Sequence, residues 1–323
     1  MQRLHIGRRH LLMAAIFLAG AYALVGWLRP GWVLEAEFAR LRWLAGADEA
    51  TLVAADHRWR YVETGEGPLV VLVHGFTGAK ENWLPLMREL RSDHRLVAPD
   101  LPGWGESERK PGADYGPVAQ AARLREFLAA LPRAPGVPAQ PRLLVGHSMG
   151  GQIVGLLAAR APDAVGPLVL MDAAGVPFRE NAFGRAVLAG SNPFQVRTRA
   201  DLDRYLGIVF TDPPFVPWPA DRALVQRRAR DAAFEQSVLD RIGRGPESLQ
   251  LADELSKIAS PVLLLWCRDD RVIDASAADV FAAGLRESRT VLLDGCGHMP
   301  MMAAPAEVAR VLRMAPSPAP AAR

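Results

Sequence analysis

Apolar runs free of charge alternate with amphipathic segments along most of this chain. Residues 69–73 are continuously apolar and rich in β-branched side chains, as expected of a strand buried on both faces. Residues 82–90 and 118–131 instead repeat apolar positions at helical spacing. Further strands are expected at 51–54, 58–63, 95–98, 143–145, 168–171, 262–266 and 291–293, and further helices at 149–160 and 305–312. Buried strands that alternate with helices predict a mostly parallel central sheet with helices on both faces.

This alternation is interrupted between Asp172 and Val262, where the pattern is helical and irregular and includes a proline-rich stretch at 211–219. Helices inserted between two strands of an open parallel sheet most simply form a cap over the carboxyl ends of the strands, where ligands bind. The predicted division is a core of residues 51–175 and 257–315, with a helical cap of residues 176–256 between the sixth and seventh strands. The Pro/Ala-rich tail, residues 316–323, is expected to be disordered.

The N-terminal segment differs from the body. Leu11 to Leu28 carries no charge across 18 residues and follows Arg8 and Arg9. That length just spans the hydrocarbon core of a bilayer, and the basic flank predicts a cytoplasmic N-terminus with the body on the other side. Residues 1–30 are therefore expected to be a membrane anchor. The alternative is a signal segment cleaved after the small-x-small sequence 21–23, which would leave a secreted or periplasmic body.

Residues 31–50 are expected to connect this anchor to the body. Within them, residues 33–44 show the pattern of an amphipathic helix. Such a helix can lie on the bilayer surface or pack against the body, and the sequence leaves both open.

Composition narrows the range of functions. The chain has 323 residues, enough for one large domain with a cap, and a net charge of only +3. Without a basic run, no nucleic-acid partner is expected. The two cysteines show no metal-ligand spacing. The serine chemistry that the motifs predict needs neither a metal nor a cofactor, so none is expected.

Gly146-His147-Ser148-Met149-Gly150 matches the G-x-S-x-G pattern of a nucleophile elbow. An apolar strand precedes it and a helix of small residues follows. A serine on so sharp a turn is strained, and the flanking glycines prevent collisions between neighbouring segments. The helix that follows directs backbone N–H groups toward developing negative charge. The pattern predicts a nucleophilic Ser148.

A serine nucleophile needs a base and an acid. Of the seven histidines, His298 directly follows the last strand and comes last in the Ser…Asp…His order of this kind of sheet, so it is the predicted base. His74 is expected to be neutral and structural, and His147 to point away from Ser148.

The predicted acid is Asp270, which follows the strand at 262–266, with Asp269 and Asp172 as open alternatives. Two backbone N–H groups, those of Phe76 and Met149, are expected to form the oxyanion hole.

Cys267 and Cys296 lie on the two loops that carry the predicted acid and base. These loops should converge at one edge of the sheet. A disulfide between the two residues and a pair of free thiols both remain open.

Several motifs together carry a family resemblance. They are His74–Gly78, Pro99–Ser107, Gly146–Gly151, the Trp-x-x-x-Asp-x-x-Ile stretch that begins at Trp266, and Cys296–His298. Over residues 56–313 the chain resembles the α/β-hydrolase superfamily. Residues 76–83, 150–153 and 171–175 are similar to membrane-anchored monoacylglycerol lipases and related bacterial lipases and esterases. The resemblance implies the α/β-hydrolase fold, a helical cap and one N-terminal anchor. Cys267 departs from the family pattern, which usually has glycine there.

The resulting hypothesis is a serine carboxylic-ester hydrolase that acts on acylglycerols such as monoacylglycerol. Ser148 would form an acyl-enzyme, with His298 as base and Asp270 orienting it. Two alternatives remain: hydrolysis of a carbon–carbon bond in ring-cleavage products by the same triad, and a non-catalytic ligand receptor of the same fold.

Overall fold

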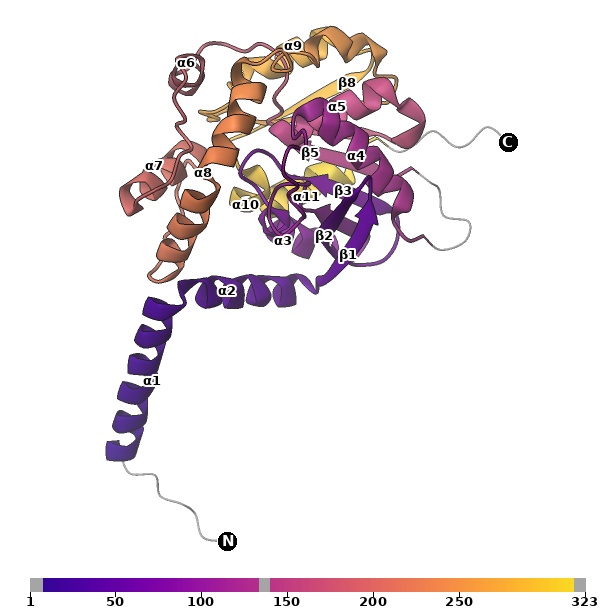
Figure 1. Ribbon diagram of the computed structural model, residues 1–323. Helices are drawn as coiled ribbons and strands as arrows, with labels where there is room; N and C mark the ends of the chain where they lie inside the picture. The colour runs from indigo at the N-terminus through magenta and orange to yellow at the C-terminus, as the bar shows by residue number, and fades with distance from the viewer. Residues whose placement is uncertain (1–7, 134–139, 317–323) are drawn as a thin grey trace.

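The computed structural model describes residues 8–133 and 140–316 (Figure 1). Its strands are β1 (Asp48–Ala54), β2 (His57–Thr64), β3 (Leu69–Val73), β4 (Arg95–Pro99), β5 (Leu143–His147), β6 (Leu168–Met171), β7 (Val262–Cys267) and β8 (Ser288–Leu293). Its α-helices are α1 (Arg8–Leu28), α2 (Pro30–Ala45), α3 (Leu84–Leu90), α4 (Pro117–Ala130), α5 (Met149–Arg160), α6 (Ala182–Leu188), α7 (Arg199–Val209), α8 (Ala220–Arg244), α9 (Ser276–Gly284), α10 (Pro300–Ala303) and α11 (Pro305–Arg313). Three short 3₁₀ turns are η1 (Lys80–Trp83), η2 (Pro162–Ala164) and η3 (Ala252–Lys257).

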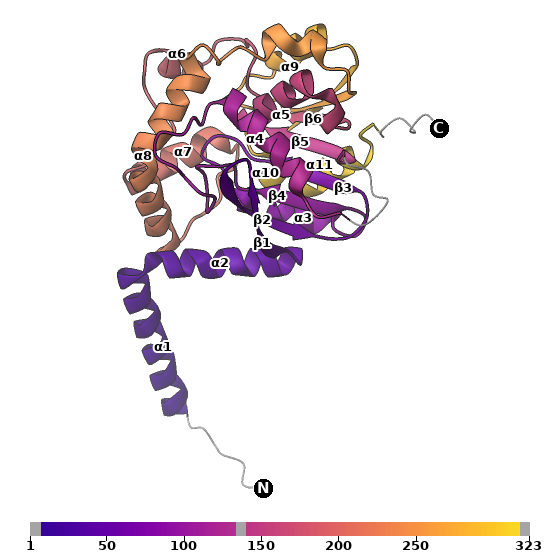
Figure 2. The ribbon, with the colours of Figure 1, turned by 45° about the vertical axis from the view of Figure 1, so that its right-hand side comes forward.

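The eight strands form one sheet in the order β1-β2-β4-β3-β5-β6-β7-β8. The β1–β2 and β2–β4 pairs are antiparallel, and every pair from β4 to β8 is parallel. Helices α4, α5 and α9 cover one face, whereas α3 and α11 pack together on the other (Figures 1 and 2). Strands β3, β5 and β6 are buried along their whole length, which explains their uninterrupted apolar sequences. The predicted fold is confirmed.

The local differences from the predicted elements have clear causes. The first hairpin turns at Ala55 and Asp56, whose φ angles are 46° and 66°, so β2 begins at the buried His57, one residue before the strand expected at 58–63. Strand β8 begins three residues earlier than expected. It is the edge strand of the sheet, and its first half carries exposed polar side chains, so a search for apolar runs does not find that half. Helix α9 was not expected from the sequence.

The cap consists of the segment between β6 and β7 and includes α6, α7 and α8. The long helix α8 packs against α6, α7 and α2, so it connects the cap to the N-terminal region (Figure 2). A buried ion pair within α8, between Arg228 and Glu235 at 2.7 Å, satisfies charges that would otherwise be costly in the interior. The division at 176 and 256 stays a prediction, and the tail beyond Pro316 lies outside the described residues.

The N-terminal helices leave the body in two steps. Helix α1 extends away from it and buries only Gly26, with a mean hydropathy of 2.1 over its most apolar window (Figure 1). Its length and composition suit either a membrane span or a signal sequence. Helix α2 packs on the body through Leu34 and contacts α3 and α8. The sequence left open whether this amphipathic segment lies on the bilayer surface or packs against the body, and the structure shows the contact with the body.

Candidate active site

Ser148 forms the sharp turn between β5 and α5. Its φ and ψ angles are 54° and −121°, a region that residues with a side chain rarely occupy. The turn requires glycine on both sides. A Cβ atom at Gly146 would lie 2.4 Å from the carbonyl oxygen of Gly150, and one at Gly150 would lie 2.4 Å from that of Val73. The glycines therefore allow β3, β5 and α5 to approach closely enough for the turn to form.

A cavity of about 460 Å³ lies between Ser148 and the cap. From the core it is lined by Phe76, Ser148 and Met149. From the cap it is lined mainly by apolar side chains: Phe178, Phe183, Val187, Phe194, Leu239 and Ile242. This volume falls within the usual range for small-molecule sites, and mainly apolar walls with a few polar residues fit a ligand with a hydrocarbon part.

His298 and Asp270 form a buried pair at the carboxyl edge of the sheet. His298 Nδ1 lies 2.7 Å from Asp270 Oδ2. Asp270 Oδ1 accepts hydrogen bonds from the backbone N–H groups of Val272 at 2.7 Å and Ile273 at 3.1 Å. Because the Asp270 carboxylate acts as an acceptor, the proton of its hydrogen bond with His298 belongs to Nδ1 of the imidazole. This tautomer leaves Nε2 free to accept a proton.

The two alternative acids are held elsewhere. Asp269 is exposed, and its Oδ2 accepts from the N–H of Gly295 at 3.2 Å. Asp172 is buried at the end of β6, and its Oδ1 accepts from the N–H of Cys267 at 2.9 Å. Because neither bonds to His298 within the described residues, the geometry favours Asp270 as the partner of the imidazole.

Within the same residues, the Ser148 hydroxyl makes no hydrogen bond to His298. Catalytic contacts of this kind are often loose without substrate and tighten when it binds. The two segments are instead linked through His147, whose Nε2 lies 2.7 Å from the carbonyl oxygen of His298. Burial is the main cause that holds the pKa of His147 well below its usual range, and the nearby His298 lowers it further. His147 is therefore neutral and donates from Nε2.

The sequence did not predict this role for His147, which was expected only to point away from Ser148. The hydrogen bond joins residues separated by 151 positions, and no local pattern announces it.

The cap also contacts the backbone of the candidate base. The N–H of His298 donates to the carbonyl oxygen of Val209, the last residue of α7, at 2.8 Å. Gly297 has a φ angle of 60°, and a Cβ there would come within 2.8 Å of the same oxygen. The cap and the loop that carries His298 thus meet backbone to backbone.

Cys267 and Cys296 form a disulfide, with Cα atoms 5.7 Å apart. The first ends β7 three residues before Asp270, and the second lies two residues before His298. Of the two states left open by the sequence, the structure has the bonded one. The bond joins the loop of the candidate acid to the loop of the candidate base.

Phe76 and Met149 line the cavity beside Ser148, as an oxyanion hole requires. No hydrogen bond within the described residues uses the backbone N–H of either one. His74 holds the first of the two loops: its Nδ1 donates to the carbonyl oxygen of Gly75 at 2.8 Å, and its Nε2 accepts from the N–H of Leu101 at 3.0 Å. Burial lowers the pKa of His74 to about 4, so it is neutral near pH 7.

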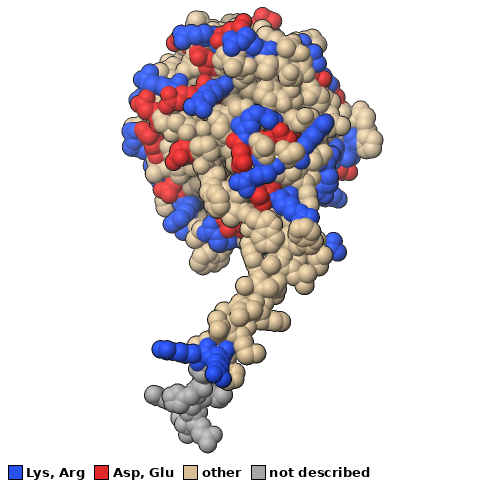
Figure 3. Space-filling view, turned by 90° about the vertical axis from the view of Figure 1, so that its left-hand side faces the viewer, with Lys and Arg blue, Asp and Glu red and all other residues tan. Residues whose placement is uncertain are grey.

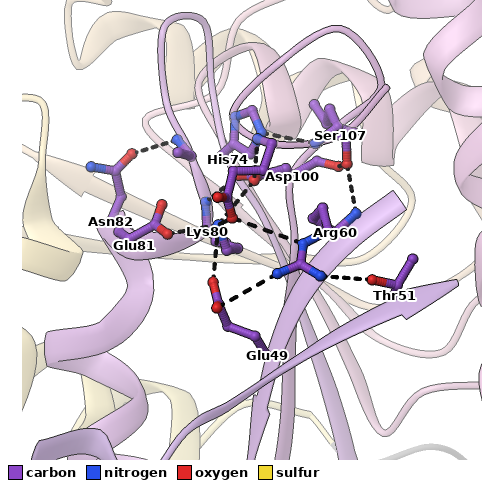
Figure 4. Close-up of polar contacts among 12 residues, drawn as sticks. Glu49, Thr51, Arg60, His74, Lys80, Glu81, Asn82, Asp100 and Ser107 are labelled. Atoms are coloured by element: carbon purple, nitrogen blue, oxygen red, sulfur yellow. Dashed lines mark hydrogen bonds and ion pairs between the residues drawn. The ribbon is translucent and has the colours of Figure 1, made fainter. Parts of the chain in front are cut away.

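The same loop is fixed by a buried lysine (Figure 4). The Lys80 ammonium lies 2.6 Å from Glu106, 2.7 Å from Glu81 and 3.3 Å from Asp100. Glu49, Glu81 and Glu106 bring three carboxylates close together, but the lysine already stands among them as their cation. This cluster is best explained as a structural ion-pair network and not as a metal site.

Comparisons with known proteins agree with this architecture. The model of the family described as "Alpha/beta hydrolase family" matches residues 70–311. Lipase 1 of Psychrobacter immobilis is 29% identical over 264 residues, covering 80% of both chains. Monoacylglycerol lipase ABHD6 of Mus musculus is 28% identical over 262 residues, covering 77% of this chain and 75% of its own. The crystal structure of a membrane phospholipase A, described as a bacterial virulence factor, has a TM-score of 0.83 and 35% identity over 95% of this chain and 97% of its own.

The disulfide has a direct chemical test. Alkylation of the unfolded protein is expected to modify neither cysteine before reduction and both afterwards, measured as a mass shift. The Cys267→Ala/Cys296→Ala variant should lose about 2–4 kcal/mol of unfolding free energy, because the unfolded chain is no longer cross-linked. As a control, a reductant should lower the melting temperature of the native protein but not that of the variant. Two alkyl groups added without reduction would contradict the bond.

Asp172 predicts a pH dependence of stability. Burial, together with the charge of Asp270, raises the pKa of Asp172 well above its usual value of 3.8, and its Oδ2 has no partner among the described residues. The contribution of such a carboxyl to the free energy of unfolding is present in full below pH 3.8 and is lost as the pH rises through the pKa of the folded state. The uncharged Asp172→Asn variant should therefore be more stable than the native protein at alkaline pH.

Melting temperatures between about pH 4 and pH 8 measure this difference, which should shrink toward the acid end. The control is Asp269→Asn, which removes an exposed carboxyl group and should follow the native curve. Parallel curves for Asp172→Asn and the native protein would rule out the buried, protonated carboxyl.

Proposed function

Because the chain belongs to the alpha/beta hydrolase family, we propose that it is a serine hydrolase that cleaves a carboxylic ester bond of a membrane glycerolipid. The observation that carries this proposal is the position of Ser148, which lines a mainly apolar cavity and lies on the same sheet edge as the paired His298 and Asp270. An acyl chain in the cavity brings its carbonyl carbon to the serine.

In the proposed mechanism, Ser148 Oγ attacks the ester carbonyl carbon while its proton passes to His298 Nε2. Asp270 accepts the hydrogen bond from Nδ1–H and stabilises the imidazolium that forms. The backbone N–H groups of Phe76 and Met149 donate to the oxyanion. Collapse of this intermediate breaks the ester bond, and the alcohol leaves with the proton from His298. Water then attacks the acyl-enzyme by the same steps and releases the carboxylic acid. No metal or cofactor takes part.

The substrate class is supported by the relatives. They are named lipase, monoacylglycerol lipase and membrane phospholipase A, and all of these names denote cleavage of esters in lipids. Acylglycerols such as monoacylglycerol and glycerophospholipids present the same reacting group, a fatty acyl ester of glycerol. The alternative of carbon–carbon bond hydrolysis uses the same three side chains, so only the substrate separates the two.

The proposed location is the membrane, with α1 as a single span, the N-terminus in the cytoplasm and the catalytic body on the periplasmic or outer side. Arg8 and Arg9 at the start of α1 support this orientation. The disulfide supports it independently, because such bonds persist in oxidising compartments and are rare in the cytosol. Cleavage of the segment, with release of the body on the same side, is the alternative.

The triad assignment predicts unequal effects of neighbouring substitutions. Ser148→Ala should lower kcat for a p-nitrophenyl ester by about 10³-fold or more and abolish labelling by a fluorophosphonate. Asp270→Asn should lower kcat by about 10³–10⁴-fold, because the imidazole loses its orienting partner. Asp269→Asn is the matched control and should keep nearly native activity. Substantial turnover by Ser148→Ala, or a greater loss for Asp269→Asn than for Asp270→Asn, would contradict the assignment.

The substrate proposal predicts a preference that can be measured with a panel. Membrane and soluble fractions are assayed with acylglycerols of increasing chain length, a glycerophospholipid and a vinylogous diketone. Hydrolysis should occur in the membrane fraction and favour long-chain lipid esters over the diketone, because the cavity is apolar and the enzyme shares the membrane with these lipids. Faster turnover of the diketone would support the carbon–carbon alternative.

A further inference from the structure

The loop between α7 and α8 exposes aromatic side chains that the catalytic proposal does not use. Residues 213–219 read Pro-Pro-Phe-Val-Pro-Trp-Pro and contain no charge. Phe215 is 84% exposed, and Trp218 is also exposed. Aromatic side chains in a cap normally pack inward, so two on one uncharged loop indicate an interaction surface.

This loop packs against the last turns of α1. A Cβ atom at Gly26 would lie 2.7 Å from Pro219 Cγ and 2.8 Å from Trp218 Cη2, so the side chains of the loop pack directly on the helix backbone at Gly26. The rings of Tyr22 and Trp218 meet edge to face with centroids 6.0 Å apart. Just beyond the loop, the Arg222 guanidinium lies 4.5 Å from the centre of the Trp27 ring.

These contacts fix the depth of the loop relative to a bilayer. A helix rises about 1.5 Å per residue, so Gly26 and Tyr22 lie about 3 Å and 9 Å along the axis from Leu28. When α1 spans the membrane with Leu28 at the outer boundary of the hydrocarbon, a loop that touches Gly26 and Tyr22 lies at the same level. It therefore reaches the headgroup region and the outermost hydrocarbon.

The composition of the loop suits that depth. Four of its seven residues are prolines, which have no backbone N–H to leave unsatisfied in an apolar medium. Phe215 and Trp218 supply apolar surface, and the amphipathic indole of tryptophan is typical of the boundary between lipid and water.

Helix α2 marks the same level of the membrane. Trp32 and Trp43 are both exposed and are eleven residues apart, about three turns, so they share one face of α2. Trp32 lies with Leu24 and Leu28 in the angle between α1 and α2, on the side toward which α1 extends. Figure 3 shows the uncharged α1 stalk between its basic tip and the charged body.

We propose that residues 213–219 form a second membrane contact, which seats the cap on the lipid surface beside α1. The proposal rests on the anchoring of α1 proposed above. The occupant of the surface is the bilayer itself, because the loop packs against α1, the one helix of the described residues that suits a membrane span. The contact fixes the position of the cap relative to the lipid that supplies the substrate.

A fluorescent probe on the loop tests this directly. The full-length Phe215→Cys variant is labelled with a nitrobenzoxadiazole dye without reductant, so that the two native cysteines stay in their disulfide, and is reconstituted into phosphatidylethanolamine/phosphatidylglycerol vesicles. The matched control is Val53→Cys, at a position 73% exposed on the outermost strand β1. Emission from position 215 should be blue-shifted relative to position 53 and quenched by lipids with a doxyl group near the headgroup. Emission from position 53 should show neither effect.

The outcomes separate the two proposals. Water-like emission at position 215, while the protein resists alkaline carbonate extraction, would overturn the loop contact and leave the anchor intact. Release of the protein by carbonate would overturn the anchor and the loop contact with it. A blue shift without doxyl quenching would show shielding by protein, such as a second copy of the chain, and would also overturn the proposal.

A functional variant gives a second measurement. Phe215→Asp should lower hydrolysis of vesicle lipid several-fold and leave turnover of a short soluble p-nitrophenyl ester unchanged. Val53→Asp should alter neither. Equal losses on both substrates would indicate a folding defect in the cap and would count against a role at the membrane.

Discussion

The backbone turn at Ser148 is the constraint on which the rest of the site depends. Its positive-φ turn is formed where β3, β5 and α5 meet without side chains between them, a close approach that Gly146 and Gly150 permit. The turn raises the serine above the sheet at the edge where the parallel strands end. Strands β3, β7 and β8 end at this same edge, so the loops that follow them bring residues from distant parts of the chain together around one hydroxyl group.

Much of this arrangement could be predicted because its signals are local. The strands β3, β5 and β6 are buried on both faces and read as apolar runs, and the motif around Ser148 specifies a strand, a turn and a helix within a few residues. Chain order and position after a strand led to the prediction that His298 and Asp270 form the base–acid pair, and the structure places His298 Nδ1 2.7 Å from Asp270 Oδ2. Edge strand β8 was predicted less well, because an edge is only half buried and its sequence is partly polar.

The contacts that hold the site together were not predictable in this way, because they connect residues far apart in the chain. The hydrogen bond from His147 to the carbonyl oxygen of His298 spans 151 positions, and no sequence pattern identifies its partner. The disulfide was foreseen only as one of two states, since the spacing of Cys267 and Cys296 gives no distance between their loops. Packing decides such contacts, and local sequence patterns reveal only the elements that pack.

The cap contacts both the loop of the candidate base and the N-terminal helix α1. At one end of α7, Val209 accepts a hydrogen bond from the backbone of His298, and the loop that starts four residues later packs against α1 at Gly26. A continuous run of about ten residues therefore connects the candidate base to the helix proposed to span the membrane. In the proposed membrane contact, this short connection, in which prolines restrict the backbone, would hold the cap at the level of the lipid surface. The backbone hydrogen bond between Val209 and His298 thus links the position of the cap to the geometry of the candidate active site.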